Sequence, residues 1–508
     1  MTEAAGASGR DLTAGLPLDQ CAEGQTIAAR VGDEPVLLSR FDGEFYAIGA
    51  TCTHYGGALG EGLTHGGTVR CPLHHACFDL KTGVALRAPA LDPVDRWRVD
   101  VEGNALFVRE KLDSPTPTAP APTAIGTVVI VGGGAAAVAC ANDLRRLGHD
   151  GEIVMLSADS DPPCDRPNLS KDYLAGKAPE EWIPLRSDDW YRELRVDLRL
   201  DTEVCAIDPA ERLVVCKSGE RVHYDRLLLA TGAEPRRLDG PGFDGDNVVT
   251  LRSLADARAL IQRATPHARA AIIGSSFIGL EAAAALRNRK VEVDIVAPES
   301  VPFDRILGKD VGGFLQKLHE DNGVRFHLGT VAASLNGEKL SLANGETILA
   351  DFVLLAVGVA PKTTLAQAAG LQIENGVVVD AYLETSAPGI FAAGDIAAYP
   401  DPLTGERVRI EHWAVAEHQG QTAAANMLGL RRPFRAVPFF WTEQYGQSIR
   451  YTGHASGWDE HRVEGEIGGE SFLVRYYSGG RHLASASLNR NHENLEDALK
   501  FEKTIANG

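Results

Sequence analysis

The pattern of apolar and polar positions predicts a small all-β domain at the start of the chain. From about Gln25 to Glu110, apolar and polar residues alternate in short runs such as PVLLSRFDGEFYAI and RWRVDVEGNALFVRE. Gly and Asp interrupt these runs about every eight to ten positions. Alternation with a period of two is typical of strands that bury one face, so residues 1–110 are expected to fold as a β domain.

Past residue 125 the pattern changes to strand, glycine loop and helix. TVVIVGGGAAAVACANDLRRLG (127–148) is one such unit, and ARAAIIGSSFIGLEAAAALRNRK (268–290) repeats its plan about 140 residues later. Such units build doubly wound α/β domains. After about residue 431 the text becomes strand-like again, and it closes in the helical pattern ENLEDALKFEKTIA.

The stretch SPTPTAPAPT (114–123) separates the first two patterns. It has four prolines and no apolar periodicity, which indicates a semi-rigid tether. The expected fold class is therefore multidomain, with an all-β domain, two α/β doubly wound dinucleotide-binding domains and a C-terminal α+β domain. The predicted boundaries are 1–110 for the β domain, 111–125 for the linker, 126–249 and 352–431 for the first dinucleotide-binding domain, 250–351 for the second, and 432–508 for the C-terminal domain.

Charge and cysteine usage narrow the class of protein. The 508 residues carry a formal net charge of −19, which argues against nucleic acid or an anionic membrane as a partner. The eight cysteines form no C-x-x-C pair, as expected in a reducing compartment. MTEAAGASGRDLTAG lacks the features of a secretory signal, and no apolar run approaches the roughly 20 residues that span a bilayer. A cytoplasmic location is expected.

Two Cys and two His form the first chemical motif, C-x-H, sixteen residues, then C-x-x-H, at Cys52, His54, Cys71 and His74. A tetrahedral zinc site is one interpretation of such a set. However, zinc fingers keep like ligands together, whereas here each loop supplies one Cys and one His. That arrangement suits a [2Fe-2S] cluster with two cysteines on one iron and two histidines on the other.

The glycine loops are candidate dinucleotide sites. Gly132, Gly134 and Ala137 follow a predicted strand and open a helix, where backbone N–H groups bind pyrophosphate. Asp159 is the candidate acid for the ribose. The second loop, with Gly274, Ile278 and Gly279, has Ser276 in place of the middle glycine.

The second loop also lacks the acid that usually ends the following strand, where Ala297 stands. Arg287, Arg289 and Lys290 nearby are either solvated helix-end charges or contacts for a 2′-phosphate, so NADH and NADPH both stay open.

Longer stretches resemble known families. C-x-H-x16-C-P-x-H continues into HHACFDLKTG (74–83) and resembles the Rieske domain. LLLATGAEPR (227–236) and GIFAAGDIAAYP (389–400) resemble FAD signatures of two-dinucleotide flavoprotein reductases. DRPNLSK (165–171), FIGLE (277–281), IEHWAVAEHQG (410–420) and PFFWTEQYGQSIRYTG (438–453) resemble oxygenase-type ferredoxin reductases. With the Rieske domain in front, the chain is most similar to the apoptosis-inducing-factor-like (type 3) proteins.

This resemblance implies cofactors and residues. The cofactors are FAD, a [2Fe-2S] cluster with ligands Cys52, His54, Cys71 and His74, and NADH or NADPH. Lys171 and Glu281 would lie near the flavin and the nicotinamide. The alternative for these two residues is a buried ion pair without a redox purpose. Trp413 and Trp441 would border the flavin. The full set of implied dinucleotide contacts is Gly132, Gly134, Ala137, Asp159, Arg166, Lys171, Val204, Thr231, Gly232, Arg252, Gly274, Ile278, Gly279, Glu281, Gly358, Gly394, Asp395, Glu411, His412 and Trp413.

The resemblance also marks three departures. Gly57 and Leu73 stand where some Rieske proteins have a disulfide between the cluster loops, so that bridge is expected to be absent. His75 stands where the family usually has Gly, and Cys77 lies close by. Both are expected to be ordinary loop residues, and the alternative is that either changes the hydrogen bonding to the cluster.

The predicted function is electron transfer from NAD(P)H through FAD to the Rieske cluster and on to an external acceptor, such as an oxygenase. One alternative is a flavin peroxidase or disulfide reductase that uses Cys164. The other is a redox signalling protein of the apoptosis-inducing-factor type. Monomer and homodimer both stay open.

Overall fold

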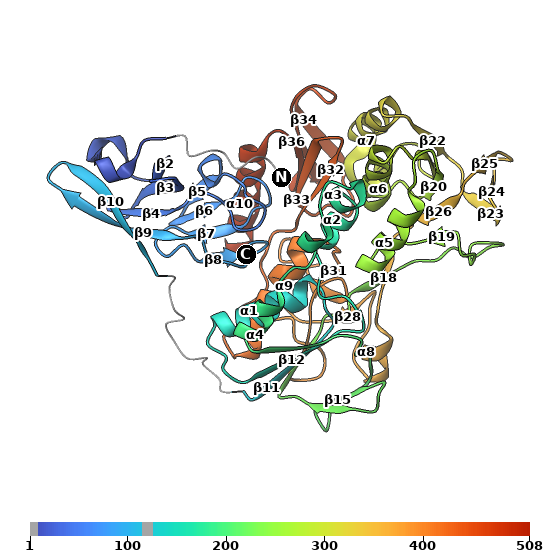
Figure 1. Ribbon diagram of the computed structural model, residues 1–508, viewed down its shortest axis with the longest axis horizontal. Helices are drawn as coiled ribbons and strands as arrows, with labels where there is room; N and C mark the ends of the chain where they lie inside the picture. Colours follow the sequence, from blue (N-terminus) through green and yellow to red (C-terminus); the bar gives the residue numbers. More distant parts are fainter. Residues whose placement is uncertain (1–8, 114–124, 508) are drawn as a thin grey trace.

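The computed structural model describes residues 9–113 and 125–507, so residues 114–124 of the predicted linker lie outside the described residues. The blue N-terminal domain in Figure 1 lies beside the red C-terminal domain with its helix α10, and the two dinucleotide-binding domains make up the remaining parts of the molecule. The predicted fold class is confirmed. No helix within the described ranges is both long and apolar enough to cross a bilayer.

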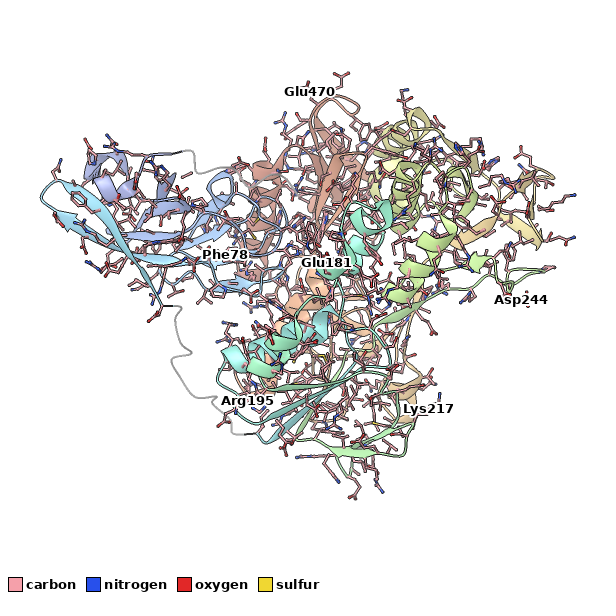
Figure 2. All side chains as sticks on the ribbon, in the orientation of Figure 1. Phe78, Glu181, Arg195, Lys217, Asp244 and Glu470 are labelled. Atoms are coloured by element: carbon pink, nitrogen blue, oxygen red, sulfur yellow. The ribbon has the colours of Figure 1, made fainter. Side chains whose placement is uncertain are left out.

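The N-terminal domain consists of two antiparallel sheets. The larger has the order β1-β10-β9-β4-β3-β2, with β1 at Leu16–Pro17, β2 at Thr26–Val31, β3 at Glu34–Phe41, β4 at Glu44–Gly49, β9 at Arg96–Glu102 and β10 at Ala105–Leu112. The smaller is formed by β5 (Leu63–His65), β6 (Thr68–Arg70), β7 (Cys77–Asp79) and β8 (Ala85–Arg87). Its core is filled by Phe78, which is fully buried (Figure 2). The small sheet thus gives the two Cys/His loops a rigid base.

The first dinucleotide-binding domain has a five-stranded parallel sheet in the order β13-β12-β11-β17-β29. Its strands are β11 (Thr127–Val131), β12 (Glu152–Leu156), β13 (Val196–Arg199), β17 (Arg226–Leu229) and β29 (Ile390–Ala392). Helices α1 (Ala135–Arg146) and α9 (Trp413–Met427) pack against each other, and a Cβ at Gly420 would lie 2.3 Å from the carbonyl oxygen of Ala136. This close approach requires glycine and holds the middle of α9 against the first turn of α1, which follows the first glycine loop.

Short elements complete this domain. They are α2 (Arg166–Leu169), α3 (Asp172–Ala175), α4 (Asp188–Glu193), α8 (Thr364–Ala368), β14 (Val204–Asp208), β15 (Leu213–Cys216), β16 (Arg221–His223), β18 (Ala233–Pro235), β27 (Val359–Pro361), β28 (Val377–Val378), β30 (Ala397–Pro400) and β31 (Arg407–Val408). Strands β18 and β27 pair where the chain leaves for the second domain and where it returns.

The second dinucleotide-binding domain repeats the parallel plan in the order β19-β26-β20-β21-β22. Its elements are β19 (Val248–Val249), α5 (Leu254–Arg263), β20 (Arg269–Ile273), α6 (Phe277–Asn288), β21 (Glu292–Ala297), α7 (Asp304–Asp321), β22 (Val324–Leu328), β23 (Ala332–Asn336), β24 (Lys339–Leu342), β25 (Thr347–Leu349) and β26 (Phe352–Leu355). The sheet includes β19 and β26, which lie just outside the predicted range 250–351. Both are short strands that pair only within this sheet, so strand pairing assigns residues 248–249 and 352–355 to the second domain, which the local sequence pattern does not indicate.

The C-terminal domain is an antiparallel sheet of order β32-β33-β36-β35-β34, with helix α10 against it. The strands are β32 (Phe439–Gln444), β33 (Gln447–Gly453), β34 (Glu460–Gly465), β35 (Phe472–Ser478) and β36 (Arg481–Leu488), and α10 spans Asn491–Asn507. Strand β32 faces both the second dinucleotide-binding domain and the N-terminal domain, and it therefore contributes to both sites described below.

Candidate functional site

A deep cavity lies where the two dinucleotide-binding domains and the C-terminal domain meet. Most of the predicted FAD and nucleotide contacts line it, from segments far apart in the sequence. The predicted residues in its wall are Gly134, Arg166, Lys171, Gly232, Arg252, Ile278, Glu281, Gly394, Asp395, Glu411, His412 and Trp413. Phe277, Phe440 and Trp441 complete the wall with aromatic rings.

The two predicted catalytic residues meet in this cavity. Lys171 Nζ lies 2.8 Å from Glu281 Oε2. The same oxygen accepts a hydrogen bond from Ser170 Oγ at 2.6 Å, and Oε1 accepts one from Thr442 Oγ1 at 2.7 Å. The carboxylate is thus held from both sides, and it places the ammonium group at the cavity wall.

The polar atoms of the cavity fit a flavin nucleotide. Arg252 Nη2 donates to Asp395 Oδ2 at 2.8 Å, and burial lowers the pKa of Arg166. Within the described residues, Arg252 Nε and His412 Nδ1 are buried without a hydrogen-bond partner. The guanidinium Nε is always a donor and the neutral His412 ring offers either a donor or an acceptor, so a ligand with both kinds of polar group, such as FAD with its phosphates, hydroxyls and carbonyl groups, fits this wall.

The first glycine loop and its neighbours form a second hollow. Asp159 and Arg166 line it together with Gly133 and Cys164. A Cβ at Gly132 would lie 2.2 Å from the carbonyl oxygen of Ala230, so only glycine fits this turn.

The other predicted dinucleotide contacts lie outside both hollows. Ala137 is buried in α1, Thr231 follows β17, and Val204 packs on the core from β14. Gly274, Gly279 and Gly358 lie around the second loop, at the carboxyl end of β20 and β26.

Ser276 gives the second loop its shape. Its hydroxyl caps α6 by accepting a hydrogen bond from the backbone N–H of Gly279, and it donates to the carbonyl oxygen of Ala356 at 2.9 Å. The two arginines at the other end of α6 are also engaged. Arg287 donates to the carbonyl oxygens of Val291 and Asn322, and Arg289 donates to that of Leu174. These bonds hold both guanidinium groups on protein carbonyls.

The four predicted cluster ligands lie together in two like pairs. His54 Nδ1 and His74 Nδ1 are 3.2 Å apart, and Cys52 and Cys71 are close enough that the Cys71 thiol raises the pKa of Cys52. Cys52, Cys71 and His74 are buried, and burial lowers the pKa of His54 to about 3. A neutral imidazole is the form that binds metal.

This pairing distinguishes the two metal interpretations. Across residues 9–113 and 125–507, no three Cys, His, Asp or Glu side chains converge as a single metal ion requires. A single zinc ion needs four convergent ligands, whereas a [2Fe-2S] cluster needs one pair for each iron. The residues present therefore fit the cluster.

The departures noted in the sequence have structural counterparts. A Cβ at Gly57 would lie 3.0 Å from the Leu73 side chain, so these two positions face each other, and all eight cysteines are free. His75 has a φ of 63°, a backbone conformation that glycine adopts readily. Its ring stacks on Phe439 with centroids 4.1 Å apart, which holds this loop against the C-terminal domain.

Trp441 joins the two sites. Its ring centroid lies 4.0 Å from that of His74 and 6.2 Å from that of His54. Lys171 Nζ lies 6.0 Å from the same ring, which also borders the large cavity. A single indole therefore separates the cluster ligands from the dinucleotide cavity.

Further contacts, which the sequence motifs did not indicate, hold the N-terminal domain in this place. The Tyr55 hydroxyl donates to Asp165 Oδ2, and the Tyr55 ring stacks on His54. Arg70 Nη2 lies 2.7 Å from Glu502 Oε2 of α10, and Arg87 contacts the same carboxylate. His418 Nε2 lies 2.8 Å from the carbonyl oxygen of Ala88.

Three family models match the chain in succession. The Rieske [2Fe-2S] domain matches residues 14–98, pyridine nucleotide-disulphide oxidoreductase matches residues 126–420, and the reductase C-terminal model matches residues 439–500.

Individual relatives match over most of their length. Human apoptosis-inducing factor 3 is 33% identical over 489 residues, which cover 92% of this chain and 80% of the relative. The anthranilate 1,2-dioxygenase system ferredoxin–NAD(+) reductase component of Burkholderia cepacia is 38% identical over 71% of this chain and 90% of its own. The crystal structure of the covalent putidaredoxin reductase–putidaredoxin complex superimposes with a TM-score of 0.72 at 33% identity, over 75% of this chain and 94% of that one.

Proposed function

Because the chain belongs to the pyridine nucleotide-disulphide oxidoreductase family and carries a Rieske [2Fe-2S] domain ahead of it, we propose that it is a ferredoxin–NAD(+) reductase-type enzyme with its ferredoxin-like domain built in. When bound, FAD accepts a hydride from reduced pyridine nucleotide and the [2Fe-2S] cluster carries single electrons onward. The protein supplies the placement of these groups and the charges around them.

The observation that carries this proposal is the position of Trp441 between the cluster ligands and the dinucleotide cavity. It gives the fused domain a direct contact with the reductase site. A structural or sensory N-terminal domain would not require its ligand histidines at this contact.

The side chains of the cavity have distinct tasks in this function. Lys171 provides positive charge where negative charge develops on a reduced flavin, which is electrostatic preorganisation. Glu281 holds that ammonium group in place. Arg252 and Asp395 form an ion pair in the cavity wall and orient the nucleotide chain.

NADH is the proposed electron donor. Of the three basic residues that the sequence offered for the 2′-phosphate of NADPH (Arg287, Arg289 and Lys290), the two arginines already direct their donors at backbone carbonyls. All three lie at or just past the end of α6 that is opposite to the second glycine loop. The electron acceptor is proposed to be an external protein, because the relatives named above include a reductase component of a dioxygenase system and a partner of putidaredoxin.

An anaerobic titration of the purified protein with NADH, and separately with NADPH, tests this function. Bleaching of the flavin absorbance together with a Rieske-type EPR signal is expected with NADH. The Cys71→Ala variant should keep the flavin bleaching and lose the EPR signal, whereas Cys77→Ala, a buried cysteine of the same domain, should keep both. A reduced flavin beside a silent cluster in the wild-type protein would refute the proposed path.

The structure does not favour the alternative that uses Cys164. Its thiol borders the hollow with Asp159 rather than the cavity with Lys171, and burial raises its pKa. A reactive cysteine needs a lowered pKa and access to the flavin ring. No observation in the described residues favours the signalling alternative.

A further inference from the structure

A row of hydrogen-bonded side chains leads away from Glu281, on the side opposite to Lys171. Thr442 Oγ1 lies 2.7 Å from Glu281 Oε1, and Gln444 Nε2 lies 3.0 Å from Thr442 Oγ1. His319 Nε2 is 2.8 Å from Gln444 Oε1, and the Tyr445 hydroxyl is 3.4 Å from His319 Nδ1. The row is unbroken from the cavity wall to the end of strand β32.

These side chains are deeply buried and come from different domains. Thr442 and Gln444 lie on β32 and are 1% exposed, and His319 on α7 is fully buried. Glu281 lies on α6, and its partners Ser170 and Lys171 come from the first dinucleotide-binding domain. Polar side chains in such positions are costly unless they are fully hydrogen-bonded, and this row satisfies them through one another.

The donors in the row all point the same way. The amide of Gln444 donates to Thr442 and its carbonyl accepts from His319, so His319 carries its proton on Nε2 and accepts from Tyr445 on Nδ1. Burial lowers the pKa of His319 to about 4, which keeps the ring neutral. Because the amide of Gln444 has no acidic proton to pass on, the row is suited to hold Glu281 rather than to conduct protons.

Tyr445 shows that the row is maintained at a cost. It occupies a two-residue turn with Gly446, between the paired residues Gln444 and Gln447, with φ values of 52° for Tyr445 and 76° for Gly446. Asn, Asp or Gly is the usual first residue of such a turn, and a bulky side chain is rare there. The Tyr445 ring packs edge-on against His319 at 5.0 Å. The strained conformation places the phenol where it completes the row.

We propose that Thr442, Gln444 and His319 are positioning residues, which align the Glu281 carboxylate so that it holds the Lys171 ammonium at the flavin. This deepens the proposed function and rests on it. Glu281 of the second dinucleotide-binding domain is bonded to Lys171 of the first domain and to Thr442 of the C-terminal domain. The position of the lysine therefore depends on the relative positions of all three domains.

The test replaces the hydroxyl nearest to Glu281. Thr442→Val removes the donor without changing the volume much, and Thr442→Ser restores it. Thr452→Val is the matched control, since Thr452 is also fully buried, lies on the adjacent strand and donates to Asn494 at 2.9 Å. The measurements are the reduction potential of the bound flavin at pH 8, the rate of its reduction by NADH, the Kd for NADH and the melting temperature.

Thr442→Val should slow flavin reduction about tenfold, as expected for loss of a hydrogen bond to a charged group, while the Kd for NADH stays unchanged. The flavin potential should fall, because a dipole that offsets the carboxylate charge is lost. Thr442→Ser should recover both values and Thr452→Val should leave both at the wild-type level. Equal effects of Val and Ser at position 442, or of Val at positions 442 and 452, would overturn the proposal.

A second variant distinguishes a connected row from separate contacts. Gln444→Met has nearly the same volume and cuts the row at its middle. If the row acts as a unit, the double variant Thr442→Val/Gln444→Met should reduce flavin no more slowly than the slower single variant. If the fold-decrease in the double variant equalled the product of the two single fold-decreases, the proposal would be overturned. Absence of NADH-driven bleaching in the wild-type protein would instead refute the proposed function itself.

Discussion

Glu417 is a single carboxyl group that works against stability at neutral pH. It is 4% exposed in α9, and within the described residues its Oε2 has no hydrogen-bond partner. Burial, and then the charge of Asp165, raises the pKa of Glu417 well above its usual value. The folded protein therefore binds more protons than the unfolded chain above the usual glutamate pKa, and stability falls as pH rises through that window.

We therefore expect Glu417→Gln to stabilise the protein by about 1–3 kcal/mol at pH 8 and by little near pH 4, because the amide needs no deprotonation. Melting temperatures of variant and wild type across this pH range measure the difference. Glu406→Gln, an exposed position, is the control and should show no such trend. A gain that did not depend on pH would contradict this account.

A substitution of Lys171 tests whether its positive charge speeds flavin reduction. Lys171→Met keeps the length of the side chain and removes the charge beside Glu281, so flavin reduction by NADH should slow by about 10²–10³-fold. The exposed Lys177→Met should match the wild type. Stopped-flow absorbance gives both rates. If the rate of flavin reduction were the same in Lys171→Met as in the wild type, the ion pair of Lys171 and Glu281 would have a purely structural role.

Helix α10 fastens the N-terminal domain through one carboxylate. Although burial alone would raise the pKa of Glu502, Arg87 and Arg70 hold it below its usual value. The guanidinium of Arg70 is nearly buried, so Glu502→Gln leaves it without a counter-charge and should weaken docking of the domain by about 3 kcal/mol.

Small-angle scattering and the rate of flavin-to-cluster electron transfer measure this effect. Glu502→Gln should enlarge the particle and slow the transfer, and raised salt should act in the same direction. Glu496→Gln on the exposed face of α10 is the control. Transfer that is as fast in Glu502→Gln as in the wild type would show that the ion pair does not set the docking.

The same elements show what the sequence could predict. The glycine loops, the Cys/His loops and the alternating strands are local patterns, so residue spacing and the segments next to it predict each of them. The partners Tyr55 and Asp165 are 110 positions apart, and Arg70 and Glu502 are 432 apart. No local pattern marks such pairs, because only the packing of whole domains brings them together. Thr442 and Gln444 were missed for the same reason: in the sequence they are ordinary residues of a strand.

At the scale of the whole molecule, the domain order follows from the sequence but the docking does not. A proline-rich segment predicts that two domains are separate, and it leaves open where they meet. The contacts of Tyr55, His75, Arg70 and Ala88 place the cluster ligands on β32. Since these contacts are mostly polar, they suit an interface that forms and releases.

Trp441 covers the ring of His74, and this contact limits when the cluster can pass electrons to an external protein. While the indole packs against His74, an external acceptor cannot contact this histidine. Reduction of the cluster by the flavin and its oxidation by the acceptor therefore use the same surface and exclude each other. We expect delivery to a one-electron acceptor protein to level off as its concentration rises, at a ceiling equal to the release rate of the domain. Two unrelated acceptor proteins should share that ceiling in steady-state assays, and Glu502→Gln should raise it. Ceilings that differ between acceptors would mean that electrons leave by another face.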